Sequence, residues 1–413
     1  MNTQRESVVE EPILTVEDFV AGKQHDIFRD LRRTDPVHWH VDEDGQGQWS
    51  VTRHADVTEV SRQPEVFSSQ RGGVSRVDLV MAEQGVDPRG VMMMMTDPPQ
   101  HTRYRRLVNR GFTPRTMRLL EGELHQRTDS IVDRVAEMDA CDLVPDVAAE
   151  LPLQAIAEIM GMPQEERAQL YDWSERIRKL EDPSHPNEDS MQAAFELFGY
   201  AHALGVDRRA EPKDDILSIL ARAEVEGDDG KPTSLTEAEF DAFALLLVVA
   251  GNETTRNAIS AGVLELLRRP DQWNLLCENA GDDDWLDIAA DEILRFTSPS
   301  QHMYRTAIGD YELGGKQIKE GERVVMWYAS ANRDEGVYDD PMELDLTRHP
   351  NPHVAFGAGG PHYCLGAHLA RMELRLMIGE LARRFPTMSL DGEPESLRSN
   401  FVAGLESLPV RLA

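Results

Sequence analysis

The chain has 413 residues, and 40% of them are hydrophobic, which is enough to form a sizeable core. Its 74 acidic and 43 basic residues give a net charge of −31. This charge excludes nucleic acid and anionic membranes as main partners, because binding to phosphate requires a basic surface.

The cysteines and the apolar runs narrow the setting further. Cys141, Cys277 and Cys364 are scattered and match neither a disulfide framework nor a zinc site with paired ligands. The N-terminal stretch MNTQRESVVEEPILTVEDF has no apolar segment after a basic one, so we expect no signal peptide. The longest apolar run, from Phe243 to Gly251, is too short to cross a bilayer. We therefore expect a soluble cytoplasmic protein without a membrane span.

The first elements along the chain are two short strands, VHWHV (37–41) and QWSVTR (48–53). Four consecutive methionines follow in VMMMMTDPP (91–99). Methionine suits an adaptable apolar pocket, and a plain core turn is an equally good interpretation.

A basic segment begins directly after these methionines. His101 and Arg105 lie one helical turn apart, behind a helix start at residues 97–99. The span 98–120 holds six arginines and no acid, within an otherwise acidic chain. Alone, the segment could be a solvated basic face, but its reversed charge indicates anionic partners.

The pattern from about residue 121 to 269 is helical, as in LPLQAIAEIMGM (151–162) and DILSILARAEVE (215–226). EDPSHPNED (181–189) and EGDDGKPTS (226–234) are typical of polar surface loops. We expect one helix from Ser234 to Pro270, about 34 residues and roughly 50 Å long, because Ser234 and Glu237 have capping-box spacing.

The middle of this long helix departs from its apolar surroundings. Gly251, Asn252, Glu253, Thr254 and Thr255 stand where helix propensity and burial favour Leu or Ala. One interpretation is a polar face turned to solvent. The other is a helix opened to admit a small polar ligand, with Glu253 and Thr254 lining the notch.

Strand patterns return near the C-terminus in YELGG (311–315), ERVVMWYA (322–329) and LPVRLA (408–413). The predicted fold is therefore mainly α with small β-sheets. Glu292 and Arg295 lie three residues apart on one helix face and could form a surface ion pair. In SQHMY (300–304), Gln301 or His302 could meet a polar group of a ligand.

The segment VAFGAGGPHYCLGAHLAR (354–371) places Cys364 in a glycine-rich loop just before a strongly helical stretch. Glycines allow close approach of the backbone, and a helix N-terminus favours a thiolate. Three interpretations remain for Cys364. It could be a small core residue, a nucleophile with His362 as base but without an oxyanion-hole signature, or a thiolate ligand of haem iron.

Four segments together resemble the cytochrome P-450 monooxygenases over almost the whole chain. The cysteine loop resembles their haem-binding signature, and AGNETT (250–255) resembles their oxygen-activating motif. EILR (292–295) is similar to their Glu-x-x-Arg motif, and HTRYR (101–105) to their His-x-x-x-Arg helix. The resemblance implies a single cytochrome P-450 domain over residues 1–413, a triangular prism with a long central helix crossing over the haem. Its helix-rich core would span about 95–300 and 362–386, and its β-rich parts about 37–60, 305–330 and 388–413.

The resemblance also implies roles for single residues. Cys364 would bind the iron of haem b as a thiolate. Thr254 would hydrogen-bond the reacting dioxygen, Glu253 would relay protons, and Ala250 and Gly251 would leave room for oxygen. The other expected cofactor contacts are His101, Arg105, Arg305, His362, Phe356, Gly359 and Gly366.

Further residues are implied for the scaffold, the substrate and the electron donor. Glu292 and Arg295 would join Arg348 in a buried ion-pair network. The expected substrate pocket consists of Met94, Met95, Val249, Gln301, His302 and Met303. The expected donor surface consists of Arg103, Arg106 and Arg110.

The cysteine loop indicates a branch of the family. Phe356 stands one residue further from Cys364 than in most members, because Gly360 and Pro361 lengthen the loop. A similar loop, with AGNETTRN, PNPH and RGFTPR, is typical of a bacterial branch that hydroxylates steroid side chains and methyl-branched lipids.

The implied function is hydroxylation of an unactivated C–H bond of a small apolar substrate, with O₂ and with electrons from NAD(P)H through ferredoxin reductase and ferredoxin. A steroid side chain or a branched lipid is the expected substrate, and a smaller terpenoid alcohol is the alternative. A peroxide-driven enzyme is a second alternative, although such members generally lack the acid and threonine pair. A haem-thiolate protein that binds a ligand without turnover is the third.

Overall fold

The computed structural model describes residues 13–76, 78, 82, 85, 87–179, 187–213, 215–227 and 230–412. Helices make up most of it. They are α1 (Val16–Val20), α2 (Gln24–Thr34), α3 (His54–Ser61), α5 (Gln100–Val108), α6 (Pro114–Val135), α7 (Glu150–Met160), α8 (Arg167–Arg178), α9 (Asn187–Ala210), α10 (Ile216–Ala221), α11 (Glu237–Leu267), α12 (Pro270–Asn279), α13 (Asp283–Thr297), α14 (Tyr328–Ala331) and α15 (Ala367–Arg384).

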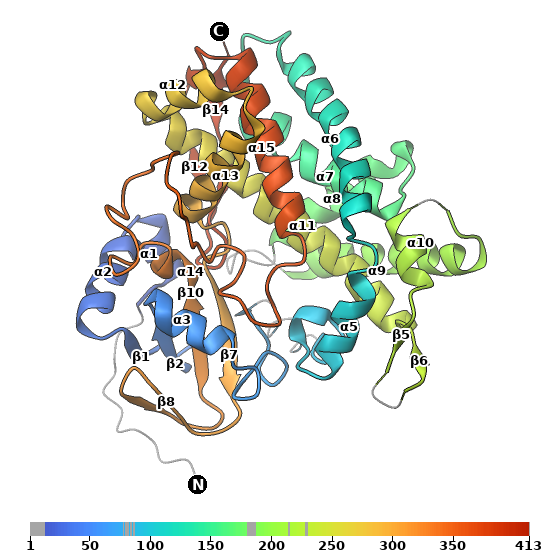
Figure 1. Cartoon of the computed structure of the whole chain (residues 1–413), viewed down its shortest axis with the longest axis vertical. Coiled ribbons are helices and arrows are strands. Elements are labelled where there is room, and N and C mark those ends of the chain that lie inside the picture. Colours follow the sequence, from blue (N-terminus) through green and yellow to red (C-terminus); the bar gives the residue numbers. More distant parts are fainter. Residues whose placement is uncertain are drawn as a thin grey trace.

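The main sheet has five strands and lies at one end of the molecule, beside α1, α2 and α3 (Figure 1). Its order is β1 (Val37–Val41), β2 (Gly47–Val51), β10 (Arg323–Trp327), β7 (His302–Ala307) and β3 (Phe67–Ser68). Strand β10 runs parallel to β2 and antiparallel to β7. The sheet thus joins N-terminal strands to strands far along the chain, since Gln48 of β2 lies opposite Arg323 of β10.

Smaller sheets hold the remaining strands. One pairs β11 (Ser389–Leu390), β14 (Pro409–Arg411) and β4 (Ala140–Asp142), and another pairs β12 (Glu395–Ser396) with β13 (Leu405–Ser407). Two hairpins complete the set, β5 (Val225–Glu226) with β6 (Pro232–Thr233), and β8 (Tyr311–Leu313) with β9 (Lys316–Ile318). Two- and three-stranded sheets are at best marginally stable alone, so each depends on packing against the rest of the molecule.

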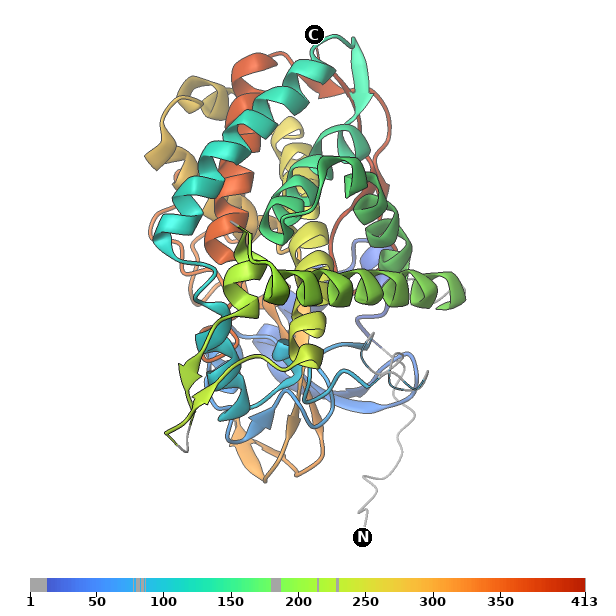
Figure 2. The ribbon, with the colours of Figure 1, turned by 90° about the vertical axis from the view of Figure 1, so that its right-hand side faces the viewer.

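The longest described helix, α11, passes through the centre of the helical part, with α9 lying across it (Figure 2). Gly205 permits this close crossing, because a Cβ there would lie 2.5 Å from the ring of Phe240. The helix has 31 residues and begins after Thr236, whose side chain accepts from the Glu239 N–H in a reciprocal capping box. The box predicted at Ser234 is therefore wrong by two residues. Both pairs have the same spacing, and the extended backbone of Thr236 (φ −65°, ψ 165°) decides between them.

The glycine-rich loop that precedes α15 is fixed against α3. Gly360 has φ +77°, and a Cβ there would lie 2.3 Å from the Ser61 carbonyl oxygen. Only glycine fits this position. The hydroxyl of Ser61 also donates to the Gly359 carbonyl at 2.8 Å. The loop therefore holds Cys364 at a defined place between the sheet-rich part and the helical part.

The predicted elements are largely confirmed. The five predicted strands correspond to β1, β2, β8, β10 and β14, and LPLQAIAEIMGM forms α7. The prediction for DILSILARAEVE is wrong in its second half, since α10 ends at Ala221 and β5 follows. Part of the loop predicted at 226–234 forms the β5–β6 hairpin, and its residues 228–229 lie outside the described residues.

Three further points concern the predictions. Residues 181–186 of the other predicted loop lie outside the described residues, and Asn187 already begins α9. Strand β7 was not predicted. Across the described part of the chain, no helix is long and apolar enough to span a membrane. The single domain over residues 1–413 stays a prediction.

Candidate active site

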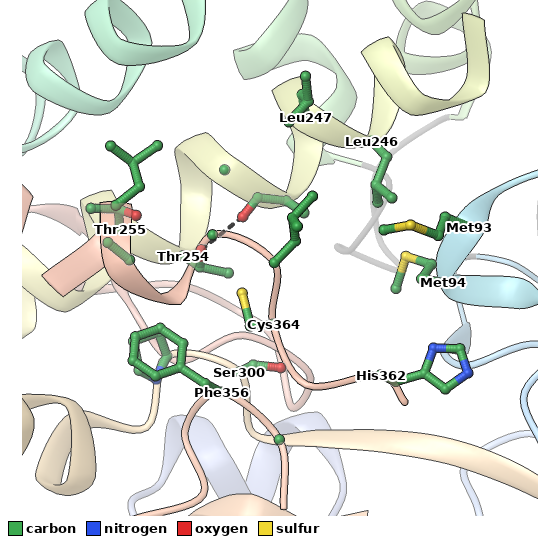
Figure 3. Close-up of a pocket in the computed structure, with 18 of the residues that line it drawn as sticks. Met93, Met94, Leu246, Leu247, Thr254, Thr255, Ser300, Phe356, His362 and Cys364 are labelled. Atoms are coloured by element: carbon green, nitrogen blue, oxygen red, sulfur yellow. Dashed lines mark hydrogen bonds between the residues drawn. The ribbon is translucent and has the colours of Figure 1, made fainter. Parts of the chain in front are cut away.

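A cavity of about 270 Å³ lies between α11, the start of α15 and the region after α13. The sulfur of Cys364 points from its loop toward α11, where Thr254 lies (Figure 3). Met93 and Met94 lie on one side of this space, near His362, and Phe356 lies on the other. The walls are mostly apolar, so the cavity suits an apolar ligand with a few fixed polar contacts.

Cys364 lies deep in the molecule, but its side chain is exposed because it faces the cavity. Its N–H donates to the Phe356 carbonyl at 2.9 Å, which closes the loop around the sulfur. Burial raises the pKa of the thiol, and a hydrogen bond from the Gly366 N–H and the charges of Arg105 and Arg371 oppose that rise. The loop therefore supports a thiolate only in part, and a cation in the cavity would have to supply the rest.

The two faces of the cysteine loop have different neighbours. Gly357 and Gly366 line the cavity, as does Phe356. Gly359, which we expected to contact a cofactor, is outside the lining, and a Cβ there would lie 3.0 Å from Nε of Arg62. Gly359 therefore serves the packing of the loop on α3. Its φ of +85° requires glycine irrespective of any ligand.

A cationic wall closes another side of the cavity. Arg105 and His101 come from α5, Arg305 from β7 and His362 from the cysteine loop, and all four line the space. The rings of His101 and His362 are 4.1 Å apart between centroids. Neither Arg105 nor Arg305 forms an ion pair with a carboxylate of the described residues.

The pKa values in this wall follow from burial and mutual repulsion. Burial, and then the charge of Arg105, lowers the pKa of His101 to about 4. Burial and the charges of Arg305, His101 and Arg105 lower the pKa of His362 well below its ordinary value. Burial also lowers the pKa of Arg305, whose Nη1 donates to the Tyr304 carbonyl at 2.6 Å. The wall is therefore prepared for an anionic partner.

The polar stretch of α11 borders the cavity without opening the helix. Ala250, Gly251 and Thr254 line the space, and the helix continues through them without a break. The hydroxyl of Thr254 donates to the Ala250 carbonyl at 2.8 Å, as the dashed line in Figure 3 shows. The predicted opening of the helix is therefore wrong. The space arises because two consecutive small residues face the cavity.

Glu253 lies off the cavity. It is 7% exposed and is not part of the lining. Arg256 lies with its Nη2 3.4 Å from Oε1 of Glu253, and its Nη1 donates to Glu175 of α8 at 2.7 Å. Asn252 also donates to Ser174 of α8, at 2.5 Å. This side of α11 therefore connects to α8, while the Thr254 side faces the cavity.

The structure brings Glu292, Arg295 and Arg348 together in one buried cluster. Arg295 donates to both carboxylate oxygens of Glu292, at 2.7 and 2.8 Å, and Arg348 donates to Oε1 at 3.2 Å. Glu292 and Arg295 are both 0% exposed. Arg295 also donates to three backbone carbonyls, of Asn332, Pro341 and Glu343. The cluster ties α13 to the segment that leads into the cysteine loop.

The expected substrate-pocket residues divide into two groups. Met94 and Met303 line the cavity, whereas Met95, Val249, Gln301 and His302 do not. Gln301 donates to the Ser298 carbonyl at 2.5 Å, and Nδ1 of His302 lies 3.2 Å from the Asn400 carbonyl. Both side chains are thus bound to backbone, because they belong to the buried face of β7 and its approach.

We did not predict from the sequence several residues that line the cavity. They are Ile156, Ile159, Phe243, Leu246, Leu247, Ser300 and Glu373. Leu246 and Leu247 lie one turn before Ala250 on α11, so helical spacing could have indicated them. The residues from α7 and α15 carried no such signal, because their packing against α11 is a tertiary feature.

Comparison with known proteins decides the family. The cytochrome P450 family model matches residues 284–412. A steroid C26-monooxygenase of Mycolicibacterium smegmatis is 43% identical over 385 residues, which cover 91% of this chain and 88% of that protein. The chain belongs to the cytochrome P450 family. It is therefore an oxidoreductase of the monooxygenase class, in which haem iron carries a cysteine thiolate ligand.

Other proteins similar to this P450 are named for, or were solved with, different ligands. Linalool 8-monooxygenase of Pseudomonas putida is 38% identical and covers 94% of the chain and 95% of its own length. A Mycobacterium marinum cytochrome P450 solved with pseudoionone has a TM-score of 0.87, 35% identity and full coverage of both chains. A Bacillus megaterium P450 solved with testosterone has a TM-score of 0.80 at 34% identity, over 94% of this chain and 99% of its own. The P450 fold is thus shown, and the predicted mainly α fold class is confirmed.

Proposed function

We propose that this P450 hydroxylates a C–H bond in the side chain of a steroid or of a branched lipid. The carrying observation is the mostly apolar cavity into which Cys364 points. The similarity to steroid C26-monooxygenases over 91% of the chain supports the substrate class. Each turnover would insert one oxygen atom of O₂ into the C–H bond and reduce the other to water, with two electrons and two protons.

The cavity residues fit haem b. A thiol with its hydrogen-bonding loop faces the cavity, and Arg105 and Arg305 stand there without carboxylate partners among the described residues. We assign Cys364 to the iron, and His101, Arg105, Arg305 and His362 to the two propionates. The bound haem would supply the site of oxygen activation, with its potential set by the thiolate. Phe356 and Gly366 would then bound the cofactor on the Cys364 side.

The residues of α11 would manage oxygen and protons. Ala250 and Gly251 keep the wall thin, and Thr254 can turn its hydroxyl from the Ala250 carbonyl toward the cavity. Glu253 would act from behind this wall, held by Arg256 and linked through it to α8. A relay through Glu253 therefore requires its side chain to leave that ion pair.

A terpenoid alcohol is the second candidate substrate. The similarity to linalool 8-monooxygenase supports it, as does the polar Ser300 in the cavity wall. The buried hydroxyl of Ser300 has no hydrogen-bond partner in the described structure. Gln301 and His302 no longer support this candidate, since their hydrogen bonds go to backbone carbonyls.

Electrons would come from NAD(P)H through ferredoxin reductase and ferredoxin in the cytoplasm. Arg106 and Arg110 are exposed and would attract an acidic donor. Arg103 is less suitable, because it is bound to Glu239 and donates to the Ser234 carbonyl at 3.0 Å. All three cysteines are free, which fits a reducing compartment.

The test is turnover of the purified haem protein with ferredoxin, its reductase and NAD(P)H. A sterol with a branched side chain and linalool are supplied in separate reactions, and the products are identified by mass spectrometry. Hydroxylation of the sterol side chain supports the proposal. Turnover of linalool alone favours the second candidate, and no product from either substrate contradicts both.

A further inference from the structure

The side chain of Asn332, at the C-terminal end of α14, bridges two segments that are far apart in the chain. It is fully buried. Its Nδ2 donates to the Ser298 hydroxyl at 2.9 Å, and its Oδ1 accepts from the Val354 N–H at 2.7 Å. Asn332 is not among the described residues that line the cavity. Its amide therefore acts on the site only through the two segments that it joins.

The first of these segments is the turn that leaves α13. Ser298 ends that helix in the left-handed conformation, with φ +44° and ψ +65°. A serine keeps this conformation only where its surroundings hold it, because its Cβ is crowded there. The Ser298 hydroxyl donates to the Arg295 carbonyl at 2.9 Å while it accepts from Asn332, so it supplies part of that hold. Pro299 and Ser300 follow directly and line the cavity, so this turn determines how they enter the wall.

The second segment is the start of the cysteine loop. The N–H of Val354 is bonded to Asn332, and the Val354 carbonyl accepts from the Gly357 N–H at 2.9 Å. The Phe356 carbonyl within this turn accepts from the Cys364 N–H, also at 2.9 Å. Phe356 and Gly357 line the cavity. Asn332 thus fixes the first turn of the loop that carries the sulfur.

The bridge of Asn332 extends further than the neighbouring ion-pair cluster. Glu292 of that cluster accepts from Asn351, which lies before the cysteine loop, whereas Asn332 reaches Val354 at its start. The two networks are joined, because Arg295 donates to the Asn332 carbonyl at 2.8 Å. A fully satisfied buried polar network specifies one arrangement of its neighbours. An apolar side chain could fill the same volume, but it would not fix one segment relative to the other.

The two bridged segments border one cavity. Ser300 belongs to the first segment and Phe356 to the second, and Figure 3 shows both in the surroundings of Cys364. A bulky ligand contacts more of this wall than a small one, so its affinity depends more strongly on where the two segments are held. The geometry therefore gives Asn332 an influence on large ligands that it lacks for small ones.

We infer that Asn332 is a positioning residue that determines specificity without touching the ligand. It holds the wall at Pro299 and Ser300 at a fixed place relative to the cysteine loop, and it thereby sets the affinity for bulky apolar ligands. The inference rests on the proposed function only in placing haem at Cys364. It does not depend on which substrate is hydroxylated.

The bridge itself can be tested without any ligand. Hydrogen exchange followed by mass spectrometry, resolved to the Val354 amide by overlapping peptides, reports whether this N–H is still bonded. In Ser298→Ala its exchange should become faster on the order of tenfold, because Asn332 has lost its anchor on the other side. Unchanged exchange at Val354 would overturn the inference.

Ser50→Ala is the matched control. Ser50 is also fully buried, and its hydroxyl is bonded to the ring nitrogens of His40 and Trp327, each at 2.8 Å. None of these three is among the described residues that line the cavity. The control should leave the Val354 amide and the ligand affinities as in the wild type. Faster exchange at Val354 in both variants would mean a general loss of stability and would also overturn the inference.

The effect on the cavity is measured as the affinity of the haem protein for two iron ligands of different size, followed by absorption spectroscopy. Imidazole is small, and clotrimazole carries the same ring on a bulky group of three aryl rings. In Ser298→Ala and Asn332→Leu the Kd of clotrimazole should rise on the order of tenfold, and that of imidazole by less than about twofold. Asn332→Asp should recover part of the loss, because its carboxyl still accepts from the Val354 N–H.

The milder Ser298→Ala keeps this test available if Asn332→Leu does not fold. An unchanged Kd of clotrimazole in Ser298→Ala, or an equal rise for both ligands, would refute the effect on specificity. A wild type that binds neither ligand would instead refute the assignment of haem to this cavity. Hydrogen exchange would still decide whether Asn332 joins the two segments.

Discussion

Single polar residues set the chemistry of an apolar cavity. Cys364 projects into it from a loop that is closed by its own hydrogen bond to the Phe356 carbonyl and held against α3 by the hydrogen bond from Ser61 to the Gly359 carbonyl. Thr254 of α11 lies opposite the sulfur, and its hydroxyl donates a hydrogen bond to the Ala250 carbonyl of the same helix. A change of one atom at these positions should alter the reaction far more than it alters the fold.

Thr254→Ala should separate electron consumption from product formation. The variant removes a hydroxyl that lines the cavity, so the fraction of NAD(P)H electrons recovered in product should fall on the order of tenfold. Thr128→Ala is the control, because Thr128 makes the same type of bond, to the Leu124 carbonyl at 2.9 Å, in a buried part of α6. Equal coupling in both variants would mean that Thr254 has no role in oxygen activation. The assay is NAD(P)H oxidation against product yield.

Arg295→Lys should weaken the fold strongly. Lysine cannot make the two bonds to Glu292 and the three to backbone carbonyls, and Glu292 is fully buried, so about 3–5 kcal/mol of unfolding free energy should be lost. Arg268→Ala is the comparison, since its ion pair with Glu265 is half exposed and should contribute less than about 1 kcal/mol. Urea unfolding measures both, and similar losses would contradict the account.

At the scale of elements, α11 and α15 together position the site. The first carries the small residues and Thr254, and the second begins directly after the cysteine loop. Glu292 of α13 also accepts hydrogen bonds from the Asp345 N–H and the Asn351 side chain, so the cluster links α13 to the segment before the cysteine loop. The distance between the two helices therefore determines the space available for a cofactor and a substrate.

The N-terminal cap of α11 offers a sharp test at this scale. Thr236→Ala removes the side-chain acceptor for the Glu239 N–H and should lower the unfolding free energy by about 1 kcal/mol. Ser234→Ala should have almost no effect, because the structure gives the Ser234 side chain no capping role. Urea denaturation of both variants would contradict the assignment if Ser234→Ala were the more damaging change.

The sequence predicted elements well where local pattern determines them. The long helix and five short strands needed only periodicity, and the capping box at Thr236 was missed because two pairs have the same spacing. Strand β7 was missed because His302–Ala307 mixes buried polar and apolar residues. Its register is set by β10 and β3 on either side, which no local pattern contains.

The prediction of the site succeeded and failed for similar reasons. Cys364, Thr254 and the two arginines of the cationic wall meet at one cavity, as the motifs implied. Gly359, Glu253, Gln301 and His302 lie off it, because which face of an element points inward depends on the neighbouring element. Glu373 was not noticed at all, since a single acid in LARMELRL looks like an ordinary polar position of a helix.

For the whole molecule, buried neutral histidines connect stability to pH. Burial lowers the pKa of His302 to about 3, from 6.5 for an unperturbed histidine. Between pH 6.5 and about 3 the His302 imidazole therefore stays mostly neutral in the folded protein, whereas in the unfolded chain it binds a proton. Its contribution to stability is therefore complete above pH 6.5 and is lost as the pH falls from 6.5 toward 3.

His302→Asn should reduce this pH dependence. Asparagine can still donate to the Asn400 carbonyl but does not titrate, so the difference in unfolding free energy between pH 6.5 and 4.5 should shrink by about 2–3 kcal/mol. His368→Asn, at an exposed position of α15, should leave the difference unchanged. Parallel pH profiles for the wild type and His302→Asn would show that His302 is not the cause.

The central claim is that Cys364 binds haem iron as a thiolate. The most direct measurement is the absorption spectrum of the reduced haem protein under carbon monoxide. The account predicts a Soret band strongly shifted to the red of that of a histidine-ligated haem, and its loss in Cys364→His. A wild-type protein that has taken up haem but lacks the shifted band would contradict the assignment of Cys364.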